Sequence, residues 1–403
     1  MRKLAIILSL ILIFTIPWED AITIAGLYSL TRYIGIVAAA AWIVSVLFNR
    51  KVRKPHVFHV LAILFILWNV ASLIWSIALD ETIQQVKTYT QLIILALLIW
   101  DLYTTSKDLK NAMQAYILGA YVAIFTTIQN YMLGKEIKLY SGGRYAGVGN
   151  AVDLALVLTL GIPIAWYLAT SSENQTIKKI LRLINLAYIP AGIFAILLTG
   201  TRMAIFAVIP AFGYILITAN RLKLSQKVLI FGSLVGSFWF IQPYIPSSVI
   251  SRLGTAGISI ASGDLGGRVN LWLQSLSYFD SSPIIGIGSG AISSPFVVGA
   301  LAHNTFVSVL TELGLIGFII FMSMLAVTFK QAIKQNNHSA TLWVTILTIW
   351  AIGVFTLTWE YRKVTWLILV LIVVAANLRD RQSDVENKTL NLANNDVMIP
   401  PSQ

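Results

Sequence analysis

Apolar residues dominate the chain in long runs that are separated by short polar segments. Each run is close to the length, about 20 residues, that a helix needs to cross a ~30 Å hydrocarbon core. The pattern therefore predicts an all-α integral membrane protein with about 12 transmembrane helices. The expected spans are 4–18, 22–48, 57–77, 88–103, 110–133, 151–170, 184–200, 203–219, 228–244, 304–328, 342–357 and 363–378.

Two connections are much longer than the others. The first, at 134–150, is rich in glycine, and the second runs from 245 to 303. Loops of the second size are usually functional or carry structure of their own. Its part 281–294 is rich in glycine and serine, which predicts a mobile or tightly turning segment. Just before it, four apolar residues at helical spacing predict an amphipathic helix that rests on the membrane surface or on the bundle: Val269, Trp272, Leu276 and Phe279.

Composition supports a single membrane domain. Of the 403 residues, 57% are hydrophobic and only 11% are charged. We expect this domain to cover 1–378, with the motifs described below concentrated in 140–325. Residues 379–403 are polar and have no apolar periodicity, which predicts a disordered cytoplasmic tail. The chain has no cysteine, so it offers neither disulfides nor thiolate metal ligands.

The positive charge of the chain is unevenly distributed. The net charge is +12, and most lysines and arginines lie at the two termini and in alternate loops. Cytoplasmic loops of membrane proteins carry an excess of these residues, so both termini should be cytoplasmic and the loop 245–303 should lie on the outer face. This placement indicates contact with membrane lipids and argues against a nucleic-acid partner.

Three arginines of the outer face lie beside glycines or in tight turns. Arg144 follows two glycines, Arg202 stands in T-G-T-R, and Arg268 follows Gly266 and Gly267. Guanidinium groups stay charged and match phosphate oxygens with a two-pronged fork, so three of them suit a diphosphate. The alternative is that such side chains extend to lipid headgroups. That interpretation fits Arg252, Lys135 and Lys138 better than an arginine fixed in a tight turn.

His303 is the only histidine expected on the outer face, at the mouth of the span 304–328. A neutral imidazole can take a proton from an attacking sugar hydroxyl, which glycosyl transfer requires of a base. The alternative is a polar residue that merely ends a loop. The coincidence of this histidine with the longest loop and with external arginines favours a catalytic or ligand-binding role.

Four further residues are candidates for supporting the site. Asn304 directly follows His303, and Trp272 lies one helical turn after Arg268. Asp153 starts the span 151–170 and could pair with an arginine. Glu312 lies nine residues after His303, roughly 13 Å along a helix, which favours a structural role. The outer carboxylates form no D-x-D pair and no histidine–carboxylate cluster, so the sequence predicts neither a metal nor another cofactor.

Three motifs together resemble the O-antigen ligase and polymerase superfamily. They are T-G-T-R between two spans, G-R-V-N-L-W before S-P-I-I-G-I-G-S-G, and A-H-N-T-F followed by T-E-L-G-L-I-G. The resemblance implies a GT-C-like membrane fold and metal-independent, inverting transfer of a glycan from undecaprenyl diphosphate on the periplasmic face of the bacterial inner membrane. It matches Arg202 and Arg268 to diphosphate-binding arginines and His303 to an essential histidine. At Arg144 the chain departs from the pattern, because G-V-G-N-A-V-D follows where the family often has an Asn-Pro-Asn-like run.

The acceptor and the reaction type stay open at the level of sequence. The acceptor could be lipid A–core, as in a ligase, another lipid-linked repeat, as in a polymerase, or an exopolysaccharide chain. A flippase or transporter of the same lipid-linked glycan is an alternative from another class. A non-catalytic membrane subunit of an export complex is a third, but it leaves the coincidence of arginines and histidine unexplained.

Overall fold

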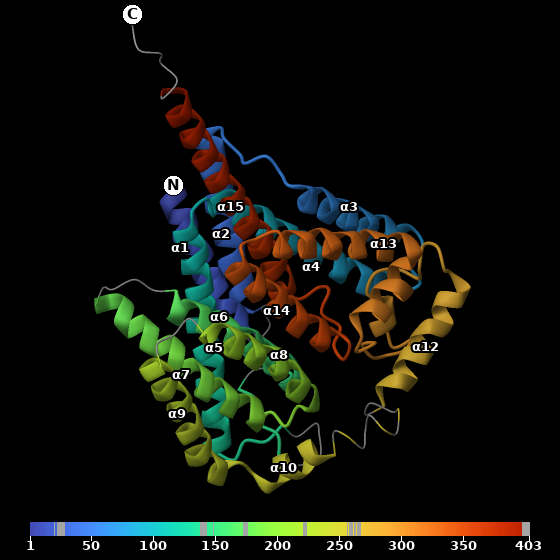
Figure 1. Cartoon of the computed structure of the whole chain (residues 1–403). Helices are drawn as coiled ribbons and strands as arrows, with labels where there is room; N and C mark the ends of the chain where they lie inside the picture. Colours follow the sequence, from blue (N-terminus) through green and yellow to red (C-terminus); the bar gives the residue numbers. More distant parts are fainter. Residues whose placement is uncertain are drawn as a thin grey trace, which may run out of the picture.

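The computed structural model describes residues 1–19, 21, 29–137, 143–147, 149–171, 176–220, 224–255, 257, 261, 263 and 267–396. The protein is an all-α integral membrane protein, as the sequence predicts (Figure 1). Seven of its described helices are long and apolar enough to cross a membrane. These helices are Leu30–Asn49, Val57–Ile74, Ser106–Met132, Ala151–Thr170, Lys179–Leu198, Arg202–Ala219 and Thr305–Ile333.

Each expected span overlaps one helix of the structure, and residues 22–28 of the second span lie outside the described residues. The matching helices are α1 (Arg2–Thr15), α2 (Leu30–Asn49), α3 (Val57–Ala71), α4 (Leu79–Leu102), α5 (Ser106–Met132), α6 (Ala151–Thr170), α7 (Thr176–Leu198), α8 (Arg202–Ala219), α9 (Leu224–Ile241), α13 (Thr305–Ile333), α14 (Asn337–Val354) and α15 (Lys363–Asp396). The outer loop adds α10 (Ser247–Gly254) and α12 (Arg268–Ser281). Short 3₁₀ turns follow α1, α3 and α9 at Ile16–Trp18, Ser72–Ile74 and Gln242–Tyr244, and a fourth lies between α12 and α13 at Ala291–Ser293.

Helices α4 and α15 extend farthest beyond their expected apolar spans. Helix α4 begins at Leu79 instead of 88, because its polar first turns are helical too. Asp80 and Glu81 lie in the first turn, where negative charge favours a helix start. Helix α15 continues to Asp396, into the tail for which the sequence predicts disorder. Residues 379–396 contain no glycine or proline that would end a helix.

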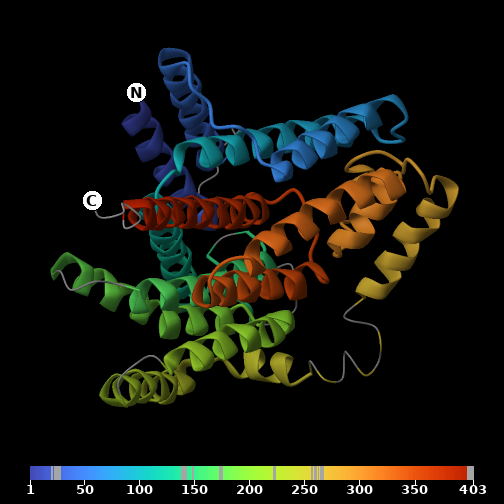
Figure 2. The ribbon, with the colours of Figure 1, turned by 45° about the horizontal axis from the view of Figure 1, so that its top comes forward.

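Helix α6 lies at the centre of the bundle. In its apolar window 78% of the residues are buried, and it packs against α5, α7, α8 and α14. Figure 2 shows α3 and α4 side by side at the edge of the molecule. Asn150 begins α6 by accepting a hydrogen bond from the Val152 N–H at 2.8 Å. The central helix therefore has a defined start on the side of the expected outer loops.

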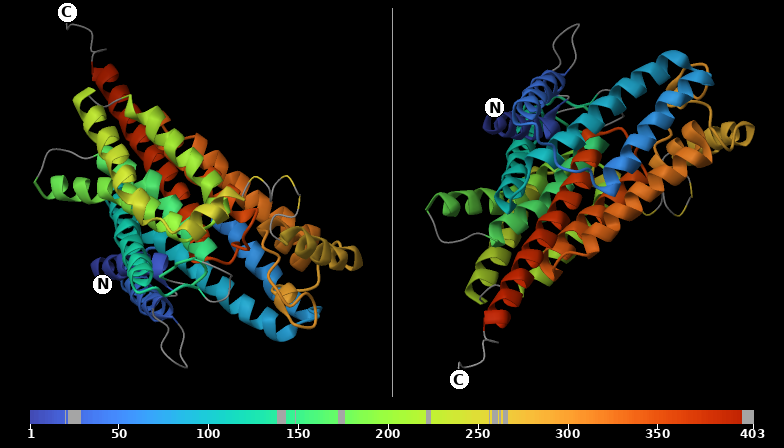
Figure 3. Two further views of the ribbon diagram at one scale, coloured as in Figure 1. Left: turned by 90° about the horizontal axis from the view of Figure 1, so that it is seen from below. Right: turned by 90° about the horizontal axis from the view of Figure 1, so that it is seen from above.

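One end of the bundle collects residues for which the charge pattern predicts the cytoplasmic face. Asp101, at the end of α4, pairs with Arg2 at 3.1 Å and accepts a hydrogen bond from the Arg53 N–H at 2.9 Å. Lys334, after α13, pairs with Asp380 of α15 at 2.8 Å. Figure 3 shows the ends of these helices from below and above. The structure thus groups these loops as the alternation of basic residues predicts.

Helix α13 is interrupted at Gly314, which has φ 64° and ψ −170°. The segment 283–288 runs alongside the interruption. The Leu315 N–H donates to the Pro283 carbonyl at 2.9 Å, and the Gly288 N–H donates to the Glu312 carbonyl at 2.9 Å. These contacts satisfy backbone groups that a break inside a membrane would otherwise leave without partners.

The part of the outer loop at 281–294 is tightly turning, which is one of the two alternatives that its sequence left open. Ser289 and Ala291 are 1% and 0% exposed. The Ser289 hydroxyl donates to the Asn69 side-chain oxygen of α3 at 2.6 Å. The segment is therefore packed into the protein between α3 and α13.

Candidate functional site

The end of α7 and the start of α8 are joined by a tight turn that carries the T-G-T-R motif. Gly200 has φ +57°, a left-handed conformation that glycine adopts without steric cost. The Thr201 side chain donates to the Ala151 carbonyl of α6 at 3.2 Å. The turn is therefore fixed to the first residue of the central helix. We call residues 199–202, together with Arg144 and Arg252, the arginine turn.

Arg144 supports this turn from within the protein. Its side chain is only 3% exposed. Its Nε donates to the Thr199 carbonyl at 2.8 Å, and its Nη2 donates to the Thr201 hydroxyl at 3.2 Å. The neighbouring Tyr145 N–H donates to the Leu198 carbonyl at 2.9 Å. The structure thus brings Arg144 and Arg202 to the same turn, although 57 residues separate Arg144 from Thr201.

Arg252 joins the same turn from the last turn of α10. Its Nε donates to the Gly200 carbonyl at 3.1 Å, and its own carbonyl accepts from the Arg202 Nε at 3.3 Å. A Cβ atom at Gly200 would lie 3.3 Å from the Arg252 Cδ and 3.4 Å from the Arg144 Cγ. The sequence favoured a lipid-headgroup role for Arg252. No local motif marks this residue, and only the folded chain shows that it belongs to the turn.

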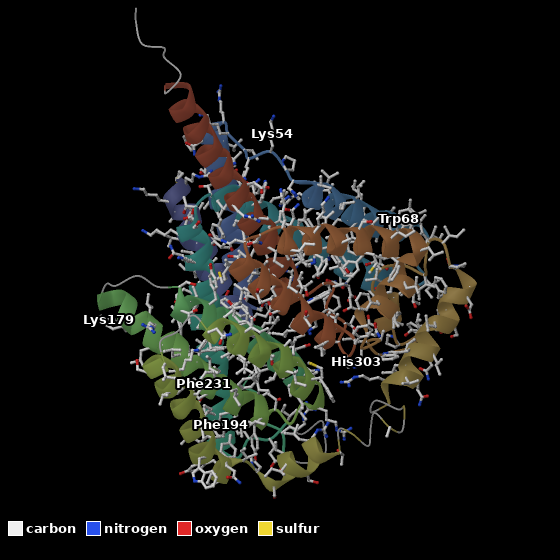
Figure 4. The ribbon with its side chains drawn as sticks, in the orientation of Figure 1. Lys54, Trp68, Lys179, Phe194, Phe231 and His303 are labelled. Atoms are coloured by element: carbon white, nitrogen blue, oxygen red, sulfur yellow. The ribbon has the colours of Figure 1, made fainter. Side chains whose placement is uncertain are left out.

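His303 lies at the entrance to α13 (Figure 4). Its φ of +51° is uncommon for a residue with a side chain, and such strain clusters at functional sites. Its Nδ1 atom is buried and has no hydrogen-bond partner. Burial and the charge of Arg268 lower the pKa of His303 below its usual 6.5, and the Asp153 charge opposes this shift. The imidazole is therefore largely neutral at pH 7 and able to accept a proton.

Asp153, on the first turn of α6, is held by the segment between α14 and α15. The Trp359 Nε1 donates to its Oδ1 at 2.7 Å, and Arg362 pairs with its Oδ2 at 2.7 Å. The expected pairing of Asp153 with an arginine is confirmed, and the partner is Arg362. We call His303, Arg268 and Asp153 the histidine end of the site.

Helix α12 confirms the expected amphipathic helix and brings Arg268 to the histidine end. It starts at Arg268, directly after Gly267 with φ +85°, and it packs against α13. Leu273 faces outward with 62% exposure. Trp272, one turn after Arg268, is partly buried, and its Nε1 has no hydrogen-bond partner. The four apolar residues at helical spacing are all partly buried: Val269, Trp272, Leu276 and Phe279.

Asn304 and Glu312 contact the backbone around the site. The Asn304 side chain accepts hydrogen bonds from the Phe306 and Val307 N–H groups at 3.0 and 3.2 Å, and so it caps α13. The Glu312 carboxylate accepts from the Gly290 N–H at 2.7 Å, and its side chain fixes the segment 281–294 to α13. These contacts hold the helix that follows His303.

Glu360, in the segment between α14 and α15, carries a buried carboxyl group. It is 1% exposed. Its Oε1 accepts from the Ser308 hydroxyl at 2.9 Å, whereas its Oε2 is buried without a hydrogen-bond partner. Burial raises the pKa of Glu360 to about 7. No motif surrounds this residue, so only its burial reveals it.

A small cleft opens beside Asp153. Its lining includes Asn150, Asp153, Trp359 and Arg362, together with apolar residues of α6 and α15. Polar side chains therefore border the cleft, while Trp359 is 1% exposed and supports Asp153 from within the protein. Within the described part of the chain, no three or more His, Cys, Asp or Glu side chains are grouped to hold a metal ion.

Residues 187–322 match the sequence model of a family described as O-antigen ligase. The resemblance seen in the motifs is confirmed. The match contains Arg202, Arg268 and His303, whereas Arg144 and Asp153 lie before it. The chain is also similar to the exopolysaccharide production protein ExoQ of Rhizobium meliloti (strain 1021). The two are 23% identical over 342 residues, which cover 77% of this chain and 72% of that protein. These similarities support an O-antigen ligase- or polymerase-like function of the glycosyltransferase-like type.

Proposed function

We propose that the protein transfers a glycan from undecaprenyl diphosphate to an acceptor sugar, as an O-antigen ligase-like glycosyltransferase. The reaction takes place on the periplasmic face of the bacterial inner membrane, needs no metal, and inverts the anomeric carbon. The acceptor is a glycan or lipid A–core. The observation that carries the proposal is the unpartnered, buried Nδ1 of His303, which lies within the electrostatic influence of both Arg268 and Asp153.

In this reaction His303 acts as the base for the acceptor. The acceptor hydroxyl oxygen forms a bond to the anomeric carbon while the bond between that carbon and the diphosphate oxygen breaks. The hydroxyl proton passes to the imidazole, and undecaprenyl diphosphate leaves as an anion. A single displacement from the side opposite the diphosphate inverts the anomeric centre. General-base assistance of this kind typically contributes about 10²–10⁴-fold in rate.

The arginines supply the positive charge that the leaving diphosphate requires. We assign Arg202 and Arg268 to its phosphate oxygens, while the buried Arg144 supports the turn and adds to its positive field. Positioned cations stabilise charge that develops in a transition state. The cleft beside Asp153 is the proposed entrance for the acceptor, because it adjoins the residue whose charge acts on His303.

Polymerisation of lipid-linked repeats is a second candidate function. The similarity to an exopolysaccharide production protein favours it. Deletion of the gene separates the two candidates on a gel of surface polysaccharide. Loss of full-length chains from the core, with lipid-linked polymer retained, supports a ligase. Capping of the core with a single repeat supports a polymerase. Accumulation of the lipid-linked unit in the cytoplasm supports a flippase and contradicts both.

The purified protein provides the direct test. With a synthetic undecaprenyl-diphosphate glycan and an acceptor, we expect transfer in the presence of EDTA. A protein that binds the donor but forms no glycosidic bond with any offered acceptor, with or without metal, contradicts the proposal.

The proposed orientation can be tested separately, since the chain contains no cysteine. Lys54 and Lys135 are both exposed, and they lie on loops with opposite predicted sides. In cells with a permeable outer envelope, a membrane-impermeant thiol reagent should label Lys135→Cys and spare Lys54→Cys. The reverse pattern would place the site on the cytoplasmic face.

A further inference from the structure

We propose that Trp359 and Arg362 are positioning residues for the transfer reaction, because together they fix the Asp153 carboxylate near the His303 imidazole. This inference rests on the proposed function, in which His303 is the base, and adds to it the residues that place Asp153 with respect to that base. Neither Trp359 nor Arg362 stands in any of the three family motifs.

The first step is that Trp359 joins the start of α13 to the start of α6. Its backbone N–H donates to the Thr305 hydroxyl of α13 at 2.8 Å, and its indole Nε1 donates to the Asp153 Oδ1 of α6 at 2.7 Å. Thr305 is two residues after His303. The Asp153 carboxylate is thus linked through one residue to the backbone that carries the base, although 206 positions separate Trp359 from Asp153.

The second step is that Trp359 is held on two sides. It is 1% exposed, and its carbonyl accepts from the Thr365 hydroxyl of α15 at 2.8 Å. The carboxylate of the next residue, Glu360, accepts from the Ser308 hydroxyl of α13 at 2.9 Å. The Glu360 carbonyl accepts from the Trp366 Nε1 of α15 at 2.8 Å. The segment that carries the indole is therefore tied both to α13 and to α15.

The third step is that Asp153 is held at both carboxylate oxygens. Trp359 donates to Oδ1, and the Arg362 Nη2 donates to Oδ2 at 2.7 Å. The other charged groups that line the cleft at Asp153, Glu19 and Lys363, form an ion pair with each other. Hydrogen bonds to an ionised carboxylate are stronger than those between neutral groups. Asp153 therefore keeps its negative charge at one place and in one orientation.

The fourth step is the chemical use of a fixed carboxylate. When His303 takes the proton of the acceptor, the imidazole becomes a cation, and a nearby negative charge stabilises it. The energy of two charges varies inversely with their distance, so a displaced Asp153 stabilises the cation less. Burial and the Arg268 charge lower the pKa of His303, and the Asp153 charge opposes them. Trp359 and Arg362 thus act on the reaction through Asp153.

Kinetics of the purified full-length protein with the synthetic lipid-linked donor test this inference. Trp359→Phe keeps an aromatic ring but removes the N–H that donates to Asp153. We expect kcat to fall about 10–100-fold, because small displacements of groups near the reacting atoms are costly. The KM for the donor should stay unchanged, since the arginines remain.

The matched control is Trp166→Phe. Trp166 is 0% exposed, and its Nε1 donates to the Thr218 hydroxyl at 2.8 Å. It lies on α6 like Asp153, but near the other end of that helix. The same substitution thus removes a comparable buried hydrogen bond far from the site, and both kcat and KM should keep their wild-type values.

Two further measurements separate positioning from structural support. An Asp153 that is no longer fixed opposes the lowering of the His303 pKa less, so the acidic limb of the pH–rate profile should move to lower pH in Trp359→Phe. In an Asp153→Asn background, Trp359→Phe should have little further effect on kcat, because both changes act along one path.

Arg362→Gln provides a second variant if Trp359→Phe does not fold. The Arg362 side chain is partly exposed, and its substitution releases the other oxygen of Asp153. We expect kcat to fall at unchanged donor KM, with little further effect in the Asp153→Asn background.

Other results overturn the inference in distinguishable ways. Unchanged kcat in both Trp359→Phe and Arg362→Gln removes these residues from the reaction. An equal loss of kcat with and without Asp153→Asn shows that they do not act through Asp153. A raised donor KM at unchanged kcat assigns them to donor binding instead. These three results leave the proposed function intact, whereas a wild-type protein without transfer activity contradicts the proposed function and the inference with it.

Discussion

The arginine turn and the histidine end differ in the kind of charge that they bring together. The turn gathers like charges, and its arginines are tied to carbonyl and hydroxyl oxygens. The histidine end places an imidazole under the influence of one cation and one carboxylate. Guanidinium groups keep their charge at all physiological pH values, whereas histidine changes its charge close to neutrality. The first region is therefore suited to holding an anion and the second to moving a proton.

The largest expected effect is a loss of transfer without a loss of donor binding. His303→Ala should reduce transfer by about 10²–10⁴-fold, because the acceptor loses its base. Donor binding should be retained, since the arginines remain. Transfer assays and lipid-binding titrations on the purified variant measure the two quantities. Near-normal transfer by a well-folded variant would remove His303 from the mechanism, and a joint loss of expression and donor binding would indicate a structural histidine.

A substitution in the arginine turn should instead weaken donor binding. Arg202→Ala should weaken donor binding by about 10–100-fold, because a charge-assisted contact to phosphate is lost. Arg268→Lys retains the charge and should have a smaller effect on donor use. Titration of donor in the transfer assay measures both variants. If donor dependence stays normal in both at normal expression, these arginines do not bind the diphosphate.

The interruption of α13 can be tested with a pair of glycine substitutions. At Gly314 φ is +64°, and a Cβ atom would lie 2.3 Å from the Ile284 carbonyl oxygen. Gly314→Ala should therefore destabilise the protein by about 1–3 kcal/mol or more. Gly213 of α8 has no neighbouring atom within 4 Å of its Cβ position, so Gly213→Ala is the matched control. Thermal unfolding in detergent should show a lower midpoint for the first variant only.

The smallest expected effect concerns pH. The Arg268 charge lowers the pKa of His303, so Arg268→Gln should raise it, and Asp153→Asn should lower it further. Transfer requires neutral imidazole, so the rate rises with pH through this pKa. The acidic limb of the pH–rate profile should thus move to higher pH in the first variant and to lower pH in the second. Arg202→Gln, in the other region, should leave the limb in place, and a shift there would contradict the separation of the two regions.

The apolar pattern predicted the spans well because hydrophobic length is a local property. Helix α6 begins and ends at the expected residues, 151 and 170. The pattern failed where a helix starts in polar sequence, as α4 does at Leu79. It also gave no sign of the interruption at Gly314, because the run G-L-I-G is compatible with a continuous helix. That interruption depends on a second segment, 283–288, which supplies its hydrogen-bond partners.

The sequence could predict only those residues of the candidate site that stand in motifs. Arg202, Arg268 and His303 stand in recognisable runs, and the sequence predicts them as site residues. Arg252 and Glu360 do not. Their significance arises from the contact of Arg252 with Gly200 and from the burial of Glu360 beside Ser308. Such contacts join residues about 50 positions apart, and no local pattern of a single sequence records them.

The start of α6 sets the distance between the arginine turn and the histidine end. Ala151 accepts a hydrogen bond from Thr201 of the arginine turn, and two residues later Asp153 adjoins the histidine end. A single turn of one enclosed helix thus sets the separation between the two regions. A helix rises only 1.5 Å per residue and resists stretching, so the separation between the two regions is constant. Under the proposed function, this fixed separation would select a donor by the length of its phosphate chain, and one phosphate too few or too many would place the anomeric carbon out of reach of the imidazole.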